Sequence, residues 1–138
     1  MRSRPHEKLE IYRLAHALAV RAHRLSLRLP RYELYGQASQ IRRASKSVSA
    51  QIVEGHALRS YKADYVRYLS RAYGSAEETI EHLRFVLETG SADGAVDDCA
   101  QLIEEYVVLT RKLFNYMRGV RQQHDPERVG DATLDERQ

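Results

Sequence analysis

Apolar residues recur along the chain at intervals of three and four positions, which is the spacing of one face of an α-helix. The first such stripe consists of Ile11, Ala15, Leu18, Ala22, Leu25 and Leu29. It predicts a helix over about residues 6–29, because Pro30 disfavours helical backbone at the residue before it. Residues 30–35 then form a short connection with room for one extra helical turn.

The same spacing predicts three further helices. The second is expected over about residues 36–58 and is rich in alanine and serine, whose small side chains let a neighbouring backbone come close. The third begins near Ser60, a good N-cap residue, and continues through Gly74 because the apolar rhythm does not break there. A loop at 89–94 precedes the fourth, which runs from about residue 95 to 120 or 121.

Four helices joined by short connections predict an all-α fold, an antiparallel up-down-up-down four-helix bundle over residues 1–122. The fourth helix is apolar around much of its circumference, where Val107, Val108 and Phe114 widen the main stripe. We therefore expect its second face to be buried against another subunit. Residues 123–138 carry five acids and little apolar periodicity, which predicts a disordered acidic tail.

The net charge of +3 conceals an uneven distribution. Residues 1–60 carry twelve Lys and Arg against four Asp and Glu, whereas residues 61–122 carry eight against ten. A basic half suggests an anionic partner such as nucleic acid. The alternative is that its cations pair with the acidic half of the chain or of a neighbouring subunit. The candidate nucleic-acid contacts lie on the first two helices: Arg13, Arg21, Arg24, Arg28, Arg42 and Lys46.

Facing residues of an antiparallel hairpin have numbers with a nearly constant sum, which is about 119 for the second and third helices. This register sets Ala44 and Ser45 opposite Gly74 and Ser75, where small side chains would permit close approach.

The same register predicts an ion pair between Arg43 and either Glu77 or Glu78, and another between Glu54 and Arg67. Such pairs fix helix register more than they add stability. We expect a structural polar network made of Gln40, Arg43, Gln51, Glu54, Ser75 and Glu78.

Known catalytic and metal-binding patterns are missing from the sequence. No histidine lies three residues after a glutamate, the spacing of di-iron bundles, and His16 and His23 share a helix face without further ligands. The single cysteine, Cys99, lies on an apolar face and is expected to be a buried thiol. An enzyme built on Glu54, Glu78 and a histidine is the least favoured reading, so we expect a non-enzyme without metal or cofactor.

The N-terminus has no apolar segment typical of a signal peptide, and no apolar run approaches the length of a membrane span. We therefore expect a cytoplasmic protein that does not act at a membrane.

Residues 40–55, which read QIRRASKSVSAQIVEG, and residues 72–78, AYGSAEE, resemble the four-helix bundle family also called the 23S rRNA-intervening sequence protein family. Its pattern is Q-x-R-R-A-x-x-S-x-x-x-N-I-x-E-G followed by A-x-G-S-x-x-E. Pro30, Glu33 and Gly36 suit its first connection, and the resemblance covers about residues 6–120. Gln51 replaces the usual Asn, and Gln37 replaces the usual Leu, which weakens an apolar contact.

This resemblance implies a homopentameric ring of four-helix bundles. Some members are encoded within insertions in 23S rRNA genes. Similar bundles act as accessory proteins of diversity-generating retroelements, in which a basic pentameric barrel binds nucleic acid and a reverse transcriptase. Our expectation is a non-enzymatic homo-oligomer that binds RNA, DNA or a nucleic-acid enzyme. The alternative is a protein-interaction scaffold that binds no nucleic acid.

Overall fold

The computed structural model describes residues 2–123, so the predicted acidic tail lies, apart from Gln123, outside the described residues. Within that range the chain is all-α. Its elements are η1 (Pro5–Lys8), α1 (Glu10–Ser26), η2 (Arg31–Glu33), α2 (Gln37–Ala57), α3 (Lys62–Glu88) and α4 (Val96–Arg121).

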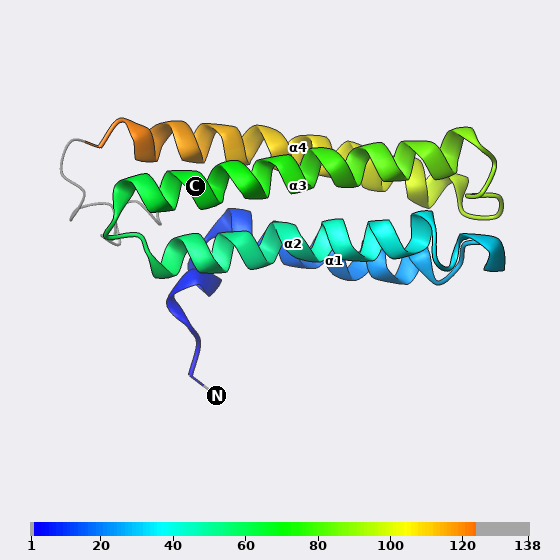
Figure 1. The fold of residues 1–138 in the computed structure, drawn as a ribbon, viewed down its shortest axis with the longest axis horizontal. Coiled ribbons are helices and arrows are strands. Elements are labelled where there is room, and N and C mark those ends of the chain that lie inside the picture. Colours follow the sequence, from blue (N-terminus) through cyan, green and yellow to red (C-terminus); the bar gives the residue numbers. More distant parts are fainter. Residues whose placement is uncertain (1, 124–138) are drawn as a thin grey trace.

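The four α-helices run along the long axis of the molecule, and α1 begins at the end of the bundle where α4 finishes (Figure 1). Contacts join α1 with α2, α2 with α3, α3 with α4, and α4 with α1. Residue numbers fall along α3 as they rise along α2 at facing positions. The facing pairs are Gln37 with His82, Arg43 with Glu78, and Ser47 with Ser75.

The core contains the apolar stripes that the sequence predicts. All six members of the first predicted stripe are buried, although α1 ends at Ser26 and Leu29 lies in the turn that follows. In α2 the side chains of Ile41, Val48 and Ile52 are fully enclosed. Two large aromatic side chains, Tyr65 and Tyr106, are also fully buried. Helix α3 passes through Gly74 without a break, as its apolar rhythm predicts.

The start of the first helix differs from the prediction. Leu9 has extended backbone, with φ −72° and ψ 128°, and it separates the short helix η1 from α1. Its side chain is fully buried. Burial of Leu9 therefore holds the chain in an extended link where the pattern alone predicts continuous helix from residue 6.

The predicted cap at Ser60 is wrong. Helix α3 begins at Lys62, and its N-cap position is Tyr61, which makes no side-chain capping hydrogen bond. The Tyr61 amide donates to the carbonyl oxygen of Leu58 over 2.8 Å, so the chain is still turning at residue 61. Ser60 lies inside this turn, one residue too early to cap α3.

The predicted close approach at Gly74 is also wrong, and the close approach occurs at Gly55. A Cβ atom built on Gly74 would meet no atom within 4 Å. A Cβ atom on Gly55 would lie 2.8 Å from the Tyr68 Cβ and 3.2 Å from the Tyr65 Cδ1. Helices α2 and α3 therefore come into close contact at Gly55, near the turn that joins them.

The exposed side of α4 carries a second line of apolar residues. Val96, Val107 and Phe114 are 49%, 39% and 44% exposed, and Ile103 between them is partly buried. Spacings of seven, four and seven place these four residues on one side of the helix. We call them the α4 apolar stripe. The Phe114 ring lies 6.1 Å from that of Tyr73 on α3.

Candidate nucleic-acid interface

Two of the six candidate cations on α1 and α2 form ion pairs with α4. An Arg21 guanidinium nitrogen lies 2.5 Å from Glu105, and one of Arg28 lies 2.6 Å from Asp98. Arg28 also donates to the carbonyl oxygen of Gly94 over 3.1 Å. Part of the basic half is thus neutralised by the acidic half within one chain, as the alternative reading of the charge pattern anticipates.

Two more candidates are bound to the backbone or to a hydroxyl group. Arg13 donates to the carbonyl oxygens of Glu7 and Lys8 over 3.2 and 2.6 Å. Arg42 donates over 3.0 Å to the hydroxyl of Ser26, which ties α2 to the last residue of α1. Arg13 therefore stabilises the link between η1 and α1, and Arg42 stabilises the packing of α2 on α1.

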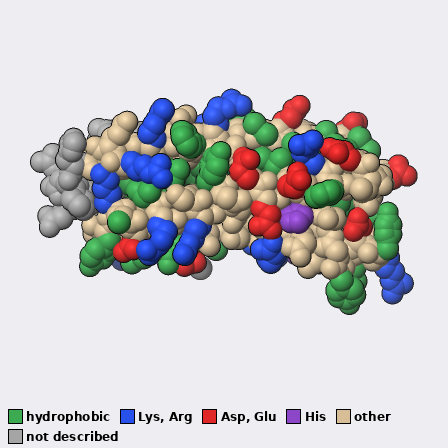
Figure 2. Space-filling view, turned by 45° about the horizontal axis from the view of Figure 1, so that its top comes forward, with side chains coloured by type: hydrophobic (Ala, Val, Ile, Leu, Met, Phe, Trp, Pro, Cys, Tyr) green, Lys and Arg blue, Asp and Glu red, His purple; other side chains and the backbone are tan. Residues whose placement is uncertain are grey.

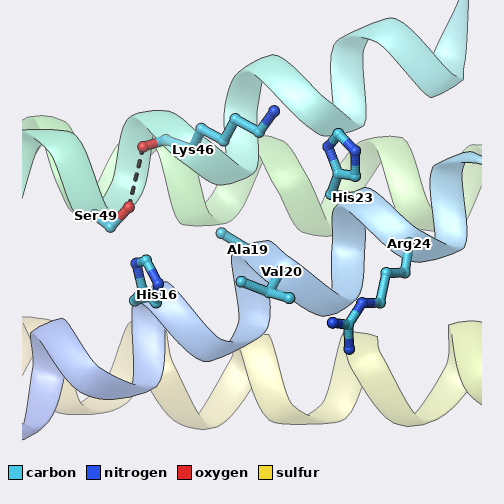
Figure 3. Close-up of a pocket in the computed structure, with 7 residues that line it drawn as sticks. All are labelled: His16, Ala19, Val20, His23, Arg24, Lys46 and Ser49. Atoms are coloured by element: carbon cyan, nitrogen blue, oxygen red, sulfur yellow. Dashed lines mark hydrogen bonds between the residues drawn. The ribbon is translucent and has the colours of Figure 1, made fainter.

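Arg24 and Lys46 remain available. Both are exposed, and neither cationic group makes a hydrogen bond or an ion pair with another residue in the part of the chain that the structure describes. They border a groove between α1 and α2 with a volume of about 370 Å³. Figure 3 shows Lys46 extending along α2 on one side of the groove, while Arg24 projects from α1 away from α2.

The α1/α2 groove is the space lined by His16, Ala19, Val20, His23, Arg24, Lys46 and Ser49. Its surface is largely apolar, because Ala19 and Val20 lie between the two imidazole rings. The Ser49 hydroxyl is turned to the Lys46 carbonyl oxygen, 3.2 Å away. The Nδ1 atom of His23 is buried and has no hydrogen-bond partner among residues 2–123.

A chain of polar contacts ties α2 to α3 on another side of the bundle. The predicted ion pair between Arg43 and Glu78 is present, and Arg43 also donates to the Gln40 side-chain oxygen over 2.8 Å. Glu78 lies 3.3 Å from His82 Nε2, and His82 Nδ1 lies 2.7 Å from the Gln37 side-chain oxygen.

Glu78 is held in its ionised form by these neighbours. Partial burial by itself raises the pKa of Glu78, but hydrogen bonds from Arg43 and His82 and their charges lower it, and the net pKa lies below the ordinary value of 4.5. A carboxylate neutralised in this way fixes helix register.

The remaining predicted members of the network lie elsewhere. Ser75 shares a hydrogen bond of 3.0 Å with Ser47. The side-chain oxygen of Gln51 is buried and has no hydrogen-bond partner among the described residues. The predicted Glu54–Arg67 ion pair is wrong, because Arg67 pairs with Asp64 in its own helix at 2.7 Å.

Sequence reasoning missed the contact between Gln37 and His82. The family comparison predicts only a lost apolar contact at Gln37, whereas the structure gives this side chain a polar partner. The signal was available, because these two residue numbers sum to 119, the value expected for facing positions of α2 and α3.

Cys99 is fully buried, as predicted, and its thiol donates to the Leu83 carbonyl oxygen over 3.4 Å. Burial raises the pKa of the thiol to about 11. Across residues 2–123 we find no group of three or more His, Cys, Asp or Glu placed to hold a metal ion. None of the helices in this range has the length and apolar character needed to cross a membrane.

Comparison with known proteins adds the family. No significant match to a curated protein is found. The family model described as 23S rRNA-intervening sequence protein matches residues 7–115, which include α1, α2, α3 and most of α4. A match over most of the chain, on a structure with the four helices that the motifs imply, shows that this chain belongs to the 23S rRNA-intervening sequence protein family.

Proposed function

We propose that this protein is a non-enzymatic, cytoplasmic homo-oligomer that binds nucleic acid, or a nucleic-acid-processing partner, through α1 and α2. The main observation behind the proposal is that Arg24 and Lys46, beside the α1/α2 groove, have no ion-pair or hydrogen-bond partner within the described residues. The family name, which refers to an intervening sequence of 23S rRNA, supports an RNA-related role. Cations without an internal partner are free to replace the counterions of a phosphate backbone.

The proposed assembly is a homopentameric ring of antiparallel up-down-up-down bundles. The opposed numbering of facing residues in α2 and α3 supports the antiparallel arrangement. The α4 apolar stripe supports self-association, because exposed apolar side chains that line up on one helix are typical of an interface. Repetition around a ring would multiply Arg24 and Lys46 of each subunit into a wider basic surface.

The surroundings of Glu54 and Glu78, the two carboxylates of the enzyme alternative, support a non-catalytic role. Glu78 is held by Arg43 and His82. Glu54, the other carboxylate of the catalytic alternative, is exposed and takes no part in that chain of contacts within the described residues. A general acid or base needs a carboxyl group positioned beside a second reacting group.

A protein-interaction scaffold is the second candidate, and the charge pattern of α3 and α4 favours it. On the face shown in Figure 2, most acidic side chains lie in one half and most basic side chains in the other. By their positions along α3 and α4, the exposed acids Glu77, Glu81, Asp97 and Glu104 lie toward the end of the bundle where α3 finishes and α4 begins. The exposed cations Arg71, Arg111 and Arg118 lie toward the opposite end. Such a surface fits a partner with charges of opposite order.

Fluorescence anisotropy with labelled structured RNA and generic DNA duplex, measured against salt concentration, tests the nucleic-acid proposal. We expect affinity to fall steeply with salt, and the double variant Arg24→Gln, Lys46→Gln to reduce the slope of log K against log salt by roughly 1.5–2. Arg84→Gln is the control, because Arg84 is an exposed cation on α3, outside both the α1/α2 groove and the α4 apolar stripe. Absence of binding at low salt would leave the scaffold as the function.

A further inference from the structure

We propose that the α1/α2 groove holds an unpaired base of single-stranded nucleic acid, with Arg24 and Lys46 bound to the phosphates that flank it. This inference rests on the proposed nucleic-acid function and narrows it from nucleic acid in general to exposed single-stranded segments. Its argument comes from the shape of the groove, its lining and the positions of its charges.

The size of the groove suits a small planar group. Its volume of about 370 Å³ lies at the lower end of the roughly 300–1,000 Å³ that small-molecule sites occupy. The floor is apolar where Ala19 and Val20 face it, and Val20 is 38% exposed. A phosphate group alone would not use this apolar area, whereas a base would cover it.

The two histidines give the groove contacts that a base needs. Imidazole rings are among the side chains on which unpaired bases stack. His16 and His23 both come from α1 and lie on either side of Ala19 and Val20 (Figure 3).

The positive charges of Arg24 and Lys46 favour an anionic ligand, and their positions favour one that is longer than the groove. Lys46 approaches from α2 and Arg24 projects from α1, so the two cations lie on different sides of the apolar floor. A nucleotide chain presents the matching order of phosphate, base and phosphate. In a duplex the base faces are stacked on one another and cannot enter the groove, so only a single strand uses both parts of the site.

The test compares an oligouridylate of about 12 nucleotides, within the usual site size of single-strand binders, with a duplex RNA of equal length. For the wild-type protein, anisotropy should show about tenfold tighter binding of the single strand at matched salt. Ala19→Leu, which fills the groove, should remove this preference and leave duplex affinity within about twofold. Ala17→Leu, a change of equal size at an exposed α1 position outside the groove, is its control.

A second pair of variants keeps the test meaningful if Ala19→Leu disturbs folding. Val20→Ser should also weaken single-strand binding several-fold, while Val108→Ser, at a valine of nearly equal exposure on α4, should not. Equal binding of single strand and duplex, unaffected by these changes, would overturn the inference while nucleic-acid binding stands. No binding of either RNA would overturn the proposed function as well. A changed subunit count on light scattering of Val20→Ser would show instead that the groove is covered by another copy.

Discussion

Gly55 shows how one missing side chain sets the distance between two helices. Gly55→Ala would place a Cβ atom 2.8 Å from the Tyr68 Cβ, so α2 and α3 must move apart. We expect this variant to lose about 1–3 kcal/mol of unfolding free energy through overpacking, although alanine is the better helix former. Urea unfolding monitored by circular dichroism measures the change.

Gly74→Ala is the matched control for that prediction. It lies in the middle of α3, where an added Cβ meets no atom within 4 Å. Its only effect should be helix propensity, a gain of about 0.5–1 kcal/mol. If both glycine variants shift stability in the same direction, the close contact at Gly55 does not govern the packing of α2 on α3.

Cys99 provides a test of the core at the same scale. Because burial raises the pKa of its thiol to about 11, the reactive thiolate is scarce at pH 8. We expect no labelling by a disulfide reagent such as Ellman's reagent in the folded protein over an hour, and rapid labelling in urea. Fast reaction of the folded protein would mean that α4 separates often enough from α3 at Leu83 to expose the Cys99 thiol to solvent.

Between elements, the contact of α2 with α3 predicts a pH dependence. The lowered pKa of Glu78 means that its carboxylate stabilises the folded state above the ordinary value of 4.5, and this contribution is lost as pH falls through the lowered pKa. Glu78→Gln should therefore be less stable than wild type by about 0.5 kcal/mol at pH 7, the size of a half-exposed ion pair. The difference should shrink as pH falls below 4.5 and the carboxylate becomes protonated.

Thermal unfolding between pH 3 and pH 8 measures this effect. Glu81→Gln serves as the control, since Glu81 is an exposed carboxylate on the same helix. A Glu78→Gln deficit that persists unchanged at low pH would mean that the amide disrupts packing and that the charge is irrelevant.

The same pair of helices shows what could be predicted from sequence and what could not. A constant sum of residue numbers was enough to place Arg43 against Glu78, because long side chains tolerate an error of a residue or two. It failed for Glu54 and Arg67, since Asp64 lies one turn from Arg67 in the same helix and offers a nearer carboxylate. Backbone contact tolerates no such error, so the close approach was assigned to Gly74 instead of Gly55.

The candidate site was less predictable than the bundle. Charge counting selected six cations on α1 and α2, but it could not separate Arg21 and Arg28, which reach acids on α4, from Arg24 and Lys46, which do not. That distinction depends on how α1 packs beside α4, two helices far apart in sequence. The groove itself arises from side chains of two helices and has no signature along the chain.

For the whole molecule, the α4 apolar stripe makes subunit number the informative measurement. Val107→Asp places a charge on the stripe and should reduce the mass measured by light scattering to that of a single chain. Val108→Asp should keep the wild-type mass, because Val108 has similar exposure but points about 100° away around the helix. A wild-type protein that is a single chain at micromolar concentration would contradict the proposed ring.

The ion pairs between α1 and α4 also bear on the order in which the protein is made. Arg21 and Arg28 are synthesised some 70 residues or more before Asp98 and Glu105, their partners. On the ribosome the α2–α3 hairpin can therefore form early, because its contacts are local. The side of α1 that packs against α4 stays exposed to solvent until α4 has been synthesised. Translation that stalls before α4 should leave a nascent chain that is open to proteases along α1.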